Sequence, residues 1–169
     1  MPSSAPLIQE KQAFRAPWLW FLMVGLNGCL LWVAFRQLVQ GIPVGSTPLP
    51  DAAVLVLLLL ILALSHLLFV MQLSTELFAE SLHVRFFPFV NRTFLLADVR
   101  AMYPRECSPL AEFGGWGIRW SWGGMAYNVA GRAGIQLELR SGKRVFVGTQ
   151  RPEDWAAALA LSKFPSSAA

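Results

Sequence analysis

The chain has 169 residues, of which 55% are hydrophobic and 14% are charged, and its formal net charge is +4. A chain of this length holds one ordinary domain, or a small domain together with membrane spans. The apolar fraction is too high for a simple soluble domain. The charge excess is too modest to favour a nucleic-acid-binding protein.

Two long apolar runs near the N-terminus predict a transmembrane helical hairpin over residues 17–71. The spans cover residues 18–39 and 52–71, after an N-terminal tail over residues 1–16. Each run of about 20 residues is long enough to cross roughly 30 Å of hydrocarbon as a helix, and a buried soluble helix rarely stays apolar on every face for that length. The first run is longer than the core of a signal peptide and has no small-residue cleavage site after it, so we expect a retained anchor.

The segment between the two runs, residues 41–50, is rich in proline and glycine and predicts a short turn between antiparallel helices. Lys11 and Arg15 precede the first run, whereas residues 41–50 contain neither lysine nor arginine. The positive-inside rule therefore places both termini in the cytoplasm. Arg36 and Asp51 lie at the outer ends of the helices, where they either pair or each reach the water at the lipid headgroups.

Asn27 and His66 are the polar exceptions inside the two runs, and they lie at similar depths from the cytoplasmic side. The structural interpretation is a hydrogen bond between helices or between subunits, worth about 0.6–2 kcal/mol. The functional interpretation is a haem ligand or a proton relay. A bis-histidine haem needs a second ligand, and His83 lies outside the runs, so we expect a packing role.

From residue 72 to residue 164 the apolar residues alternate with polar ones, which predicts an antiparallel β domain. Two short strands flank a turn at residues 79–81, and a third and a fourth are separated by a break near residues 97–98. Four alternating segments follow, with apolar positions at Trp116, Ile118, Trp120 and Trp122, at Met125, Tyr127 and Val129, at Ile135, Leu137 and Leu139, and at Val145 and Val147. Glycine-rich turns, including Gly123-Gly124, separate these segments, so we expect a meander with the tryptophans on one buried face.

An amphipathic helix is predicted from Pro152, before a tail over residues 165–169. Proline and the two acidic residues after it suit the first helical turn. Trp155, Ala158, Leu159 and Ser162 share one face. The predicted fold class is α+β: a two-helix transmembrane hairpin followed by an antiparallel β sandwich or partly open barrel, capped by a C-terminal helix.

Residues 112–159 resemble the C-terminal half of the bacterial pleckstrin-homology-like (PH-like) domains that are attached to paired membrane helices. The similar motifs are Gly-Gly-Trp-Gly-Ile-Arg at 114–119, Ala-Tyr-Asn at 126–128, Gly-Ile-Gln-Leu-Glu-Leu at 134–139 and Gly-Thr-Gln-Arg-Pro at 148–152. The resemblance implies two roughly orthogonal sheets closed by the helix, at the bacterial inner membrane. Most members have no known function, so the resemblance implies no reaction and no ligand residues.

The residues predict neither an enzyme nor a cofactor site. The glycine pairs of residues 111–131 precede strands rather than a helix, and no Gly-Lys-Ser/Thr follows, so they do not predict a phosphate loop. His66, His83, Cys29 and Cys107 are isolated from one another, which argues against a metal site. The two lone cysteines suit a reducing cytoplasm. We expect no small-molecule substrate.

Five basic residues cluster in the sequence around two turns and the start of the last helix: Arg132, Arg140, Lys143, Arg144 and Arg151. They form either an ordinary solvated rim or a contact for anionic lipid headgroups or a partner. Arg119 either points to solvent or pairs with Glu138. The sequence predicts a membrane-anchored scaffold that binds a protein partner or a second copy of itself, and the alternative is a sensor of anionic lipid headgroups.

Overall fold

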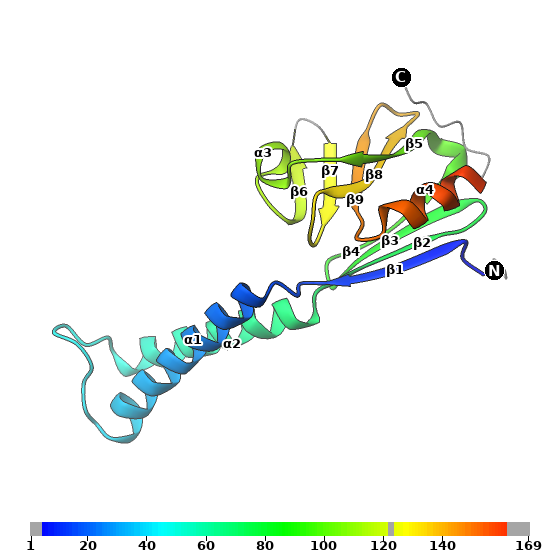
Figure 1. Cartoon of the computed structure of the whole chain (residues 1–169). Coiled ribbons are helices and arrows are strands. Elements are labelled where there is room, and N and C mark those ends of the chain that lie inside the picture. The colour runs from blue at the N-terminus through cyan, green and yellow to red at the C-terminus, as the bar shows by residue number, and fades with distance from the viewer. Residues whose placement is uncertain (1–4, 122–123, 162–169) are drawn as a thin grey trace. The chain divides into compact units, whose positions relative to one another are not determined.

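The computed structural model describes residues 5–121 and 124–161 and divides the chain into two compact units (Figure 1). One unit is a helical hairpin over residues 15–70, and the other is a β domain that combines the N-terminal segment through Phe14 with the chain from Met71 onward. Trp122, Gly123, Ser162 and the expected tail over residues 165–169 lie outside the described residues. The protein is therefore α+β, as its sequence predicts.

The hairpin consists of α1 (Pro17–Ala34), which continues as a π-helical turn (Phe35–Val39), and α2 (Asp51–Val70). Proline suits the first position of α1, since the N–H that it lacks has no partner there. The two helices pack side by side (Figure 1). Each is long and apolar enough to cross a membrane, and their ends lie within one residue of the predicted spans.

The N-terminal segment predicted as a tail contains a strand instead. β1 (Ile8–Ala13) pairs antiparallel with β2 (Gln72–Leu77) over its whole length. Its buried positions are Glu10 and Gln12 rather than apolar residues. The alternation of apolar and polar residues that identifies the other strands is therefore missing from β1, and the prediction of a tail is wrong for this reason.

The first sheet has the order β1-β2-β3-β4, with β3 (Ser81–Phe87) and β4 (Val90–Leu95) joined to β2 as successive antiparallel neighbours. The predicted turn at residues 79–81 connects β2 to β3 and ends at Ser81, the first residue of β3. The predicted break at residues 97–98 falls in a 3-10 turn (Leu96–Asp98) that leads to β5 (Val99–Glu106). These two sequence predictions are confirmed.

The second sheet is not the predicted meander. Its order is β5-β8-β9-β7-β6, with a short helix α3 (Pro109–Phe113) before β6 and strand bounds of Gly117–Ser121 for β6, Gly124–Asn128 for β7, Ala133–Leu139 for β8 and Arg144–Gly148 for β9. β7 pairs in parallel with β9 instead of with β8. Gly124 permits this close pairing, because a Cβ there would overlap the carbonyl oxygen of Arg144. Alternation predicts which face a residue occupies, and it does not predict which strands are neighbours.

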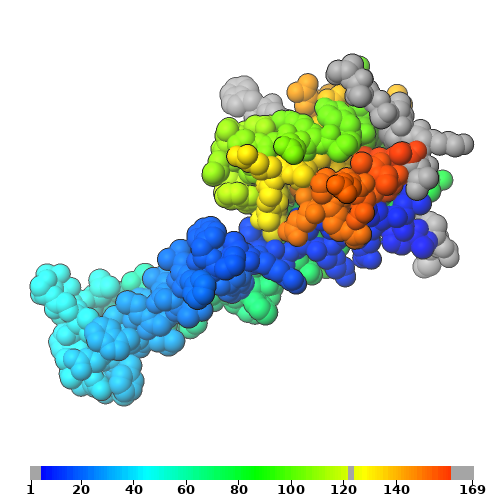
Figure 2. All heavy atoms as spheres, viewed as in Figure 1, coloured from blue at the N-terminus to red at the C-terminus, as the bar shows by residue number. Residues whose placement is uncertain are grey.

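The core lies between the two sheets and α4 (Pro152–Leu161), which packs against β1, β5 and β8. In Figure 2 the orange and red atoms of α4 lie beside the blue atoms of β1. Trp155, Ala158 and Leu159 are buried, as the helical spacing predicts. The prediction of buried strand tryptophans is wrong: Trp116 is 39% exposed and Trp120 is 86% exposed. Trp116 precedes β6 and Trp120 lies on it, two residues to either side of Ile118. β6 is an edge strand, and Ile118 is its one residue that packs against the core.

Candidate binding surfaces of the β domain

The first candidate site is an open groove between β4 of the first sheet and β6–β9 of the second, with a volume of about 670 Å³. We call it the inter-sheet groove. Its apolar lining includes Phe94, Trp120, Met125 and Tyr127, and its basic lining consists of Arg92, Lys143 and Arg144. Concave, mostly apolar surfaces with a few polar groups are the usual form of a binding site.

Trp120 is the most exposed large apolar side chain among the described residues, at 86%. Complete burial of a large apolar side chain contributes about 1.5–3 kcal/mol. Tryptophan is also one of the residues that contribute most at protein interfaces. The β domain leaves this indole in water beside an apolar cavity, where a ligand or partner would gain that free energy.

The basic side chains of the groove are weakly engaged. Arg144 approaches Glu138 at 3.9 Å, and its side chain is well exposed. Arg92 and Lys143 form no ion pair with any residue that the structure describes. Tyr127 donates a hydrogen bond to the sulfur of Met125 at 3.0 Å, and burial raises its pKa although the charge of Arg92 opposes the shift. The groove therefore combines positive charge with a neutral phenol.

The five basic residues predicted as one rim lie at the two ends of the β8–β9 pair. Arg132 precedes β8 and Arg151 follows β9, whereas Arg140, Lys143 and Arg144 lie at the opposite end. The two groups are separated by the length of β8, roughly 20 Å at about 3.4 Å per residue. Of these five residues, only Lys143 and Arg144 line the inter-sheet groove.

Two of the remaining basic residues have structural partners. Arg140 donates to the Ala97 carbonyl at 2.9 Å, and Arg151 pairs with Asp154 at 2.5 Å. Arg119 donates to the Trp116 carbonyl at 3.0 Å and is exposed, so of the two predicted alternatives it adopts the solvent-facing one. Of the five basic residues predicted as one rim, Lys143 and Arg144 therefore remain available in the groove.

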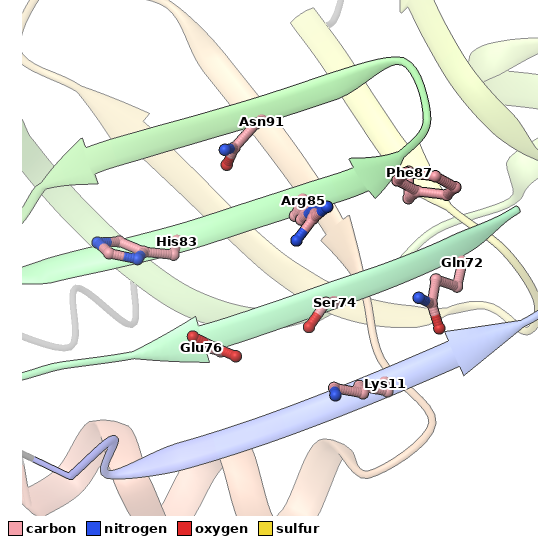
Figure 3. A pocket seen from close by; sticks show the side chains of 8 residues that line it. All are labelled: Lys11, Gln72, Ser74, Glu76, His83, Arg85, Phe87 and Asn91. Carbon is pink, nitrogen blue, oxygen red and sulfur yellow. The ribbon is translucent and has the colours of Figure 1, made fainter.

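The second candidate site is the outer face of the first sheet, where a pocket of about 390 Å³ is lined by eight residues (Figure 3). Strand register sets Lys11, Ser74, Arg85 and Asn91 opposite one another on β1, β2, β3 and β4. We call these four the outer-face row. Gln72 and Phe87 lie on one side of the row, and Glu76 and His83 on the other.

Glu10 is a buried acidic residue that no sequence pattern identifies. Its carboxylate accepts hydrogen bonds from the Thr149 hydroxyl at 2.5 Å, the Gln150 N–H at 2.8 Å and the Trp155 indole N–H at 2.7 Å. These bonds connect β1 to the end of β9 and to α4. Buried charge requires such satisfaction, so Glu10 is a structural tie and holds the first sheet in place.

In the hairpin, Asn27 makes a polar contact between helices, but its partner differs from the predicted His66. The Asn27 amide donates to the Met23 carbonyl at 2.7 Å and to the Ser65 hydroxyl at 2.8 Å. His66 is exposed on the hairpin surface. The sequence does not single out Ser65, because a serine in an apolar helix can donate its hydroxyl to a carbonyl of its own helix, as Ser65 does to Ile61.

At the ends of the helices next to the turn, Arg36 and Asp51 do not form the pair that was one of their two predicted alternatives. Asp51 accepts a hydrogen bond from the Gln37 amide at 2.7 Å, and Arg36 donates to Gln40 at 3.3 Å with its guanidinium 6.0 Å from the ring of Trp32. Arg36 and Asp51 therefore have separate partners. Gln37 also donates to the Leu49 carbonyl, and this bond connects the segment between the helices to the π-helical turn that continues α1.

Within residues 5–121 and 124–161, no group of three His, Cys, Asp or Glu side chains is placed to hold a metal ion. Cys107 is a buried free thiol; burial and the nearby Glu112 raise its pKa, while Arg105 and Arg132 oppose the shift. No protein-family model matches the chain, and no curated protein matches it. The two candidate surfaces therefore provide the basis for a functional proposal.

Proposed function

We propose that this chain is a bacterial inner-membrane protein whose two apolar helices anchor a non-catalytic interaction domain. The domain binds a segment of a partner protein in the inter-sheet groove. Support comes from the exposed indole of Trp120 beside a cavity that also holds Arg92 and Lys143. The two sheets with a closing helix support a PH-like relationship, which remains part of the proposal.

The chemistry of the groove favours an acidic partner segment with one large apolar side chain. The apolar side chain packs on Trp120 and Met125, and carboxylates pair with Arg92 and Lys143. The chain itself carries a formal net charge of +4. Like charges brought together at an interface cost several kcal/mol, so a different, acidic protein fits the groove better than a second copy of this chain.

The experiment compares matched variants of the full chain purified from native membranes in mild detergent. Trp120→Ala removes the groove indole, and Trp116→Ala removes a tryptophan that does not line the groove. Loss of an interface tryptophan costs about 2 kcal/mol, roughly 30-fold in affinity. We expect the partner to be lost from the first variant and retained by the second. Equal recovery by both variants would refute the groove as the binding site.

Charge has its own pair of variants. Lys143→Gln lies in the groove, whereas Arg132→Gln removes the same charge at the opposite end of β8. Partner binding weakened only by Lys143→Gln supports an acidic segment in the groove. Equal weakening would indicate attraction by net charge alone. Recovery of the chain solely as a homo-oligomer would replace the partner with a second copy.

Anionic lipid headgroups are a second candidate ligand, because Lys143 and Arg144 lie together at the same end of the β8–β9 pair. A basic side chain at a membrane surface contributes about 1 kcal/mol. Native mass spectrometry of the purified chain distinguishes this ligand. Bound phosphatidylglycerol that is lost on Lys143→Gln and Arg144→Gln, with the partner retained, would favour the lipid.

The proposed orientation places the β domain in the cytoplasm. Cys107 does not report on it, because its thiol is buried and of raised pKa. Two exposed serines can be replaced by cysteine to report on the two sides of the membrane: Ser46, in the turn between the helices, and Ser141, between β8 and β9. In intact cells, in a background with Cys29→Ser, an impermeant thiol reagent should label Ser46→Cys and spare Ser141→Cys. The reverse pattern would invert the topology.

A further inference from the structure

We propose that the outer-face row of the first sheet binds an oxyanion of the phosphate-monoester class. The row consists of Lys11, Ser74, Arg85 and Asn91, one residue from each strand of the sheet. This site is separate from the inter-sheet groove and shares no residue with it. The proposal therefore stands whether or not the groove binds a partner.

Strand register brings two cations to either side of a small residue. Ser74 lies directly opposite Lys11 on one neighbouring strand and opposite Arg85 on the other. Adjacent strands are about 4.8 Å apart, so the two basic residues are separated by about 10 Å at the backbone. Because serine is short, an anion can rest over its hydroxyl and receive both long side chains. Figure 3 shows these residues on the same face, with Lys11 and Arg85 on opposite sides of Ser74.

The two cations are not neutralised within the described part of the chain. Neither Lys11 nor Arg85 belongs to any of its ion pairs. The guanidinium of Arg85 lies 5.5 Å from the ring of Phe87, a cation–π contact that restricts the side chain while its N–H donors stay available. Glu76 is the one acidic residue among the eight that line the pocket, and it accepts a hydrogen bond from Gln9 at 2.5 Å.

The donor set identifies phosphate rather than a carboxylate. A guanidinium, an ammonium, a hydroxyl and the amide of Asn91 offer more donors than two carboxylate oxygens accept. Two positive charges also balance a dianion. Arginine binds phosphate with its planar fork and lysine binds it as a point charge. Gln72 adds a further amide at the edge of the pocket. A phosphate monoester uses all of these groups together.

The test is titration of the full chain with inorganic phosphate by calorimetry, in nanodiscs of neutral phosphatidylcholine. We expect saturable binding at one site. Arg85→Gln and Lys11→Gln should each weaken it about tenfold, since each removes a charge-assisted hydrogen bond. Arg85→Lys keeps the charge without the fork and should give an intermediate loss. Glu76→Gln should strengthen binding by removing the one competing carboxylate.

Arg100→Gln is the matched control, because Arg100 is exposed on β5 of the other sheet. It should leave phosphate binding unchanged. No saturable binding by the wild-type chain, or an equal loss with Arg100→Gln, would overturn the proposal. Circular dichroism identifies any variant that fails to fold, and Glu76→Gln tests the site in the opposite direction, by a gain of affinity.

A second arm identifies the source of the phosphate. Nanodiscs that contain phosphatidic acid present a phosphate monoester as a lipid headgroup. If that headgroup occupies the row, the apparent affinity for inorganic phosphate falls in these nanodiscs and recovers in neutral ones. If affinity is the same in both, the ligand is a soluble phosphate monoester. Both results support the oxyanion site and distinguish the two sources.

Discussion

Replacing Glu10 by glutamine tests whether the buried carboxylate holds β1 in the domain. Glu10 is 6% exposed, and its carboxylate accepts three hydrogen bonds, from the Thr149 hydroxyl, the Gln150 N–H and the Trp155 indole. Glutamine keeps one acceptor oxygen and turns an NH₂ group toward donors, which leaves at least one buried donor unsatisfied. Each such donor costs about 1–3 kcal/mol, and bonds to a charged group are stronger than those to a neutral amide. We expect a loss of about 3 kcal/mol.

Hydrogen exchange of the β1 amides, measured by mass spectrometry on the full chain in nanodiscs, reads this change directly. A loss of about 3 kcal/mol corresponds to roughly hundredfold faster exchange where exchange reports the opening equilibrium. Gln9→Ala is the control, because Gln9 lies next to Glu10 in sequence but on the exposed face, bonded to Glu76. Equal exchange rates of β1 in the two variants would refute the proposed tie.

Three further predictions concern packing, the hairpin and pH. Gly124→Ala should destabilise the β domain by about 3 kcal/mol in chemical unfolding, since the added Cβ would meet the backbone of Arg144 and φ is 113°. Gly142→Ala is the control: it also has positive φ but lies in open space, so it should cost about 1 kcal/mol. Equal losses in the two variants would contradict a steric role for Gly124. A double-mutant cycle of Asn27→Ala and Ser65→Ala should show a coupling of about 0.6–2 kcal/mol in hairpin stability, whereas a larger coupling of Asn27 to His66 would contradict the observed bond. Burial raises the pKa of both tyrosines of the chain above 10.0, so their contribution to stability is complete below pH 10 and is lost as pH rises through the folded-state pKa values; phenolate absorbance that appears with the ordinary pKa in the folded protein would be the contrary result.

The strands that sequence predicts correctly are those whose inward positions are apolar. Leu73 and Leu77 on β2 and Ile135 and Leu137 on β8 follow the alternation and are buried. β1 escapes prediction because its inward side chains are polar and form hydrogen bonds to partners about 140 residues away in the chain, such as Thr149 for Glu10. Propensity and period are local properties, and they contain no information about such partners.

The candidate sites are less predictable than the strands for the same reason. The outer-face row requires β1 to pair with β2, which places Lys11 opposite Ser74 although the residues of the hairpin separate them in the sequence. The exposure of Trp120 depends on β6 being an edge strand, and alternation says only that it shares a face with Ile118. Proximity to turns groups the five basic residues in sequence, whereas the length of β8 divides them in space.

The most direct test of the proposed function is site-specific photocrosslinking in living cells from position 120, with a benzophenone amino acid in place of the tryptophan. We expect an adduct with a distinct protein that disappears when Lys143→Glu is added and persists when Arg132→Glu is added. Adducts with lipid alone, or a protein adduct unaffected by Lys143→Glu, would contradict a partner bound in the inter-sheet groove.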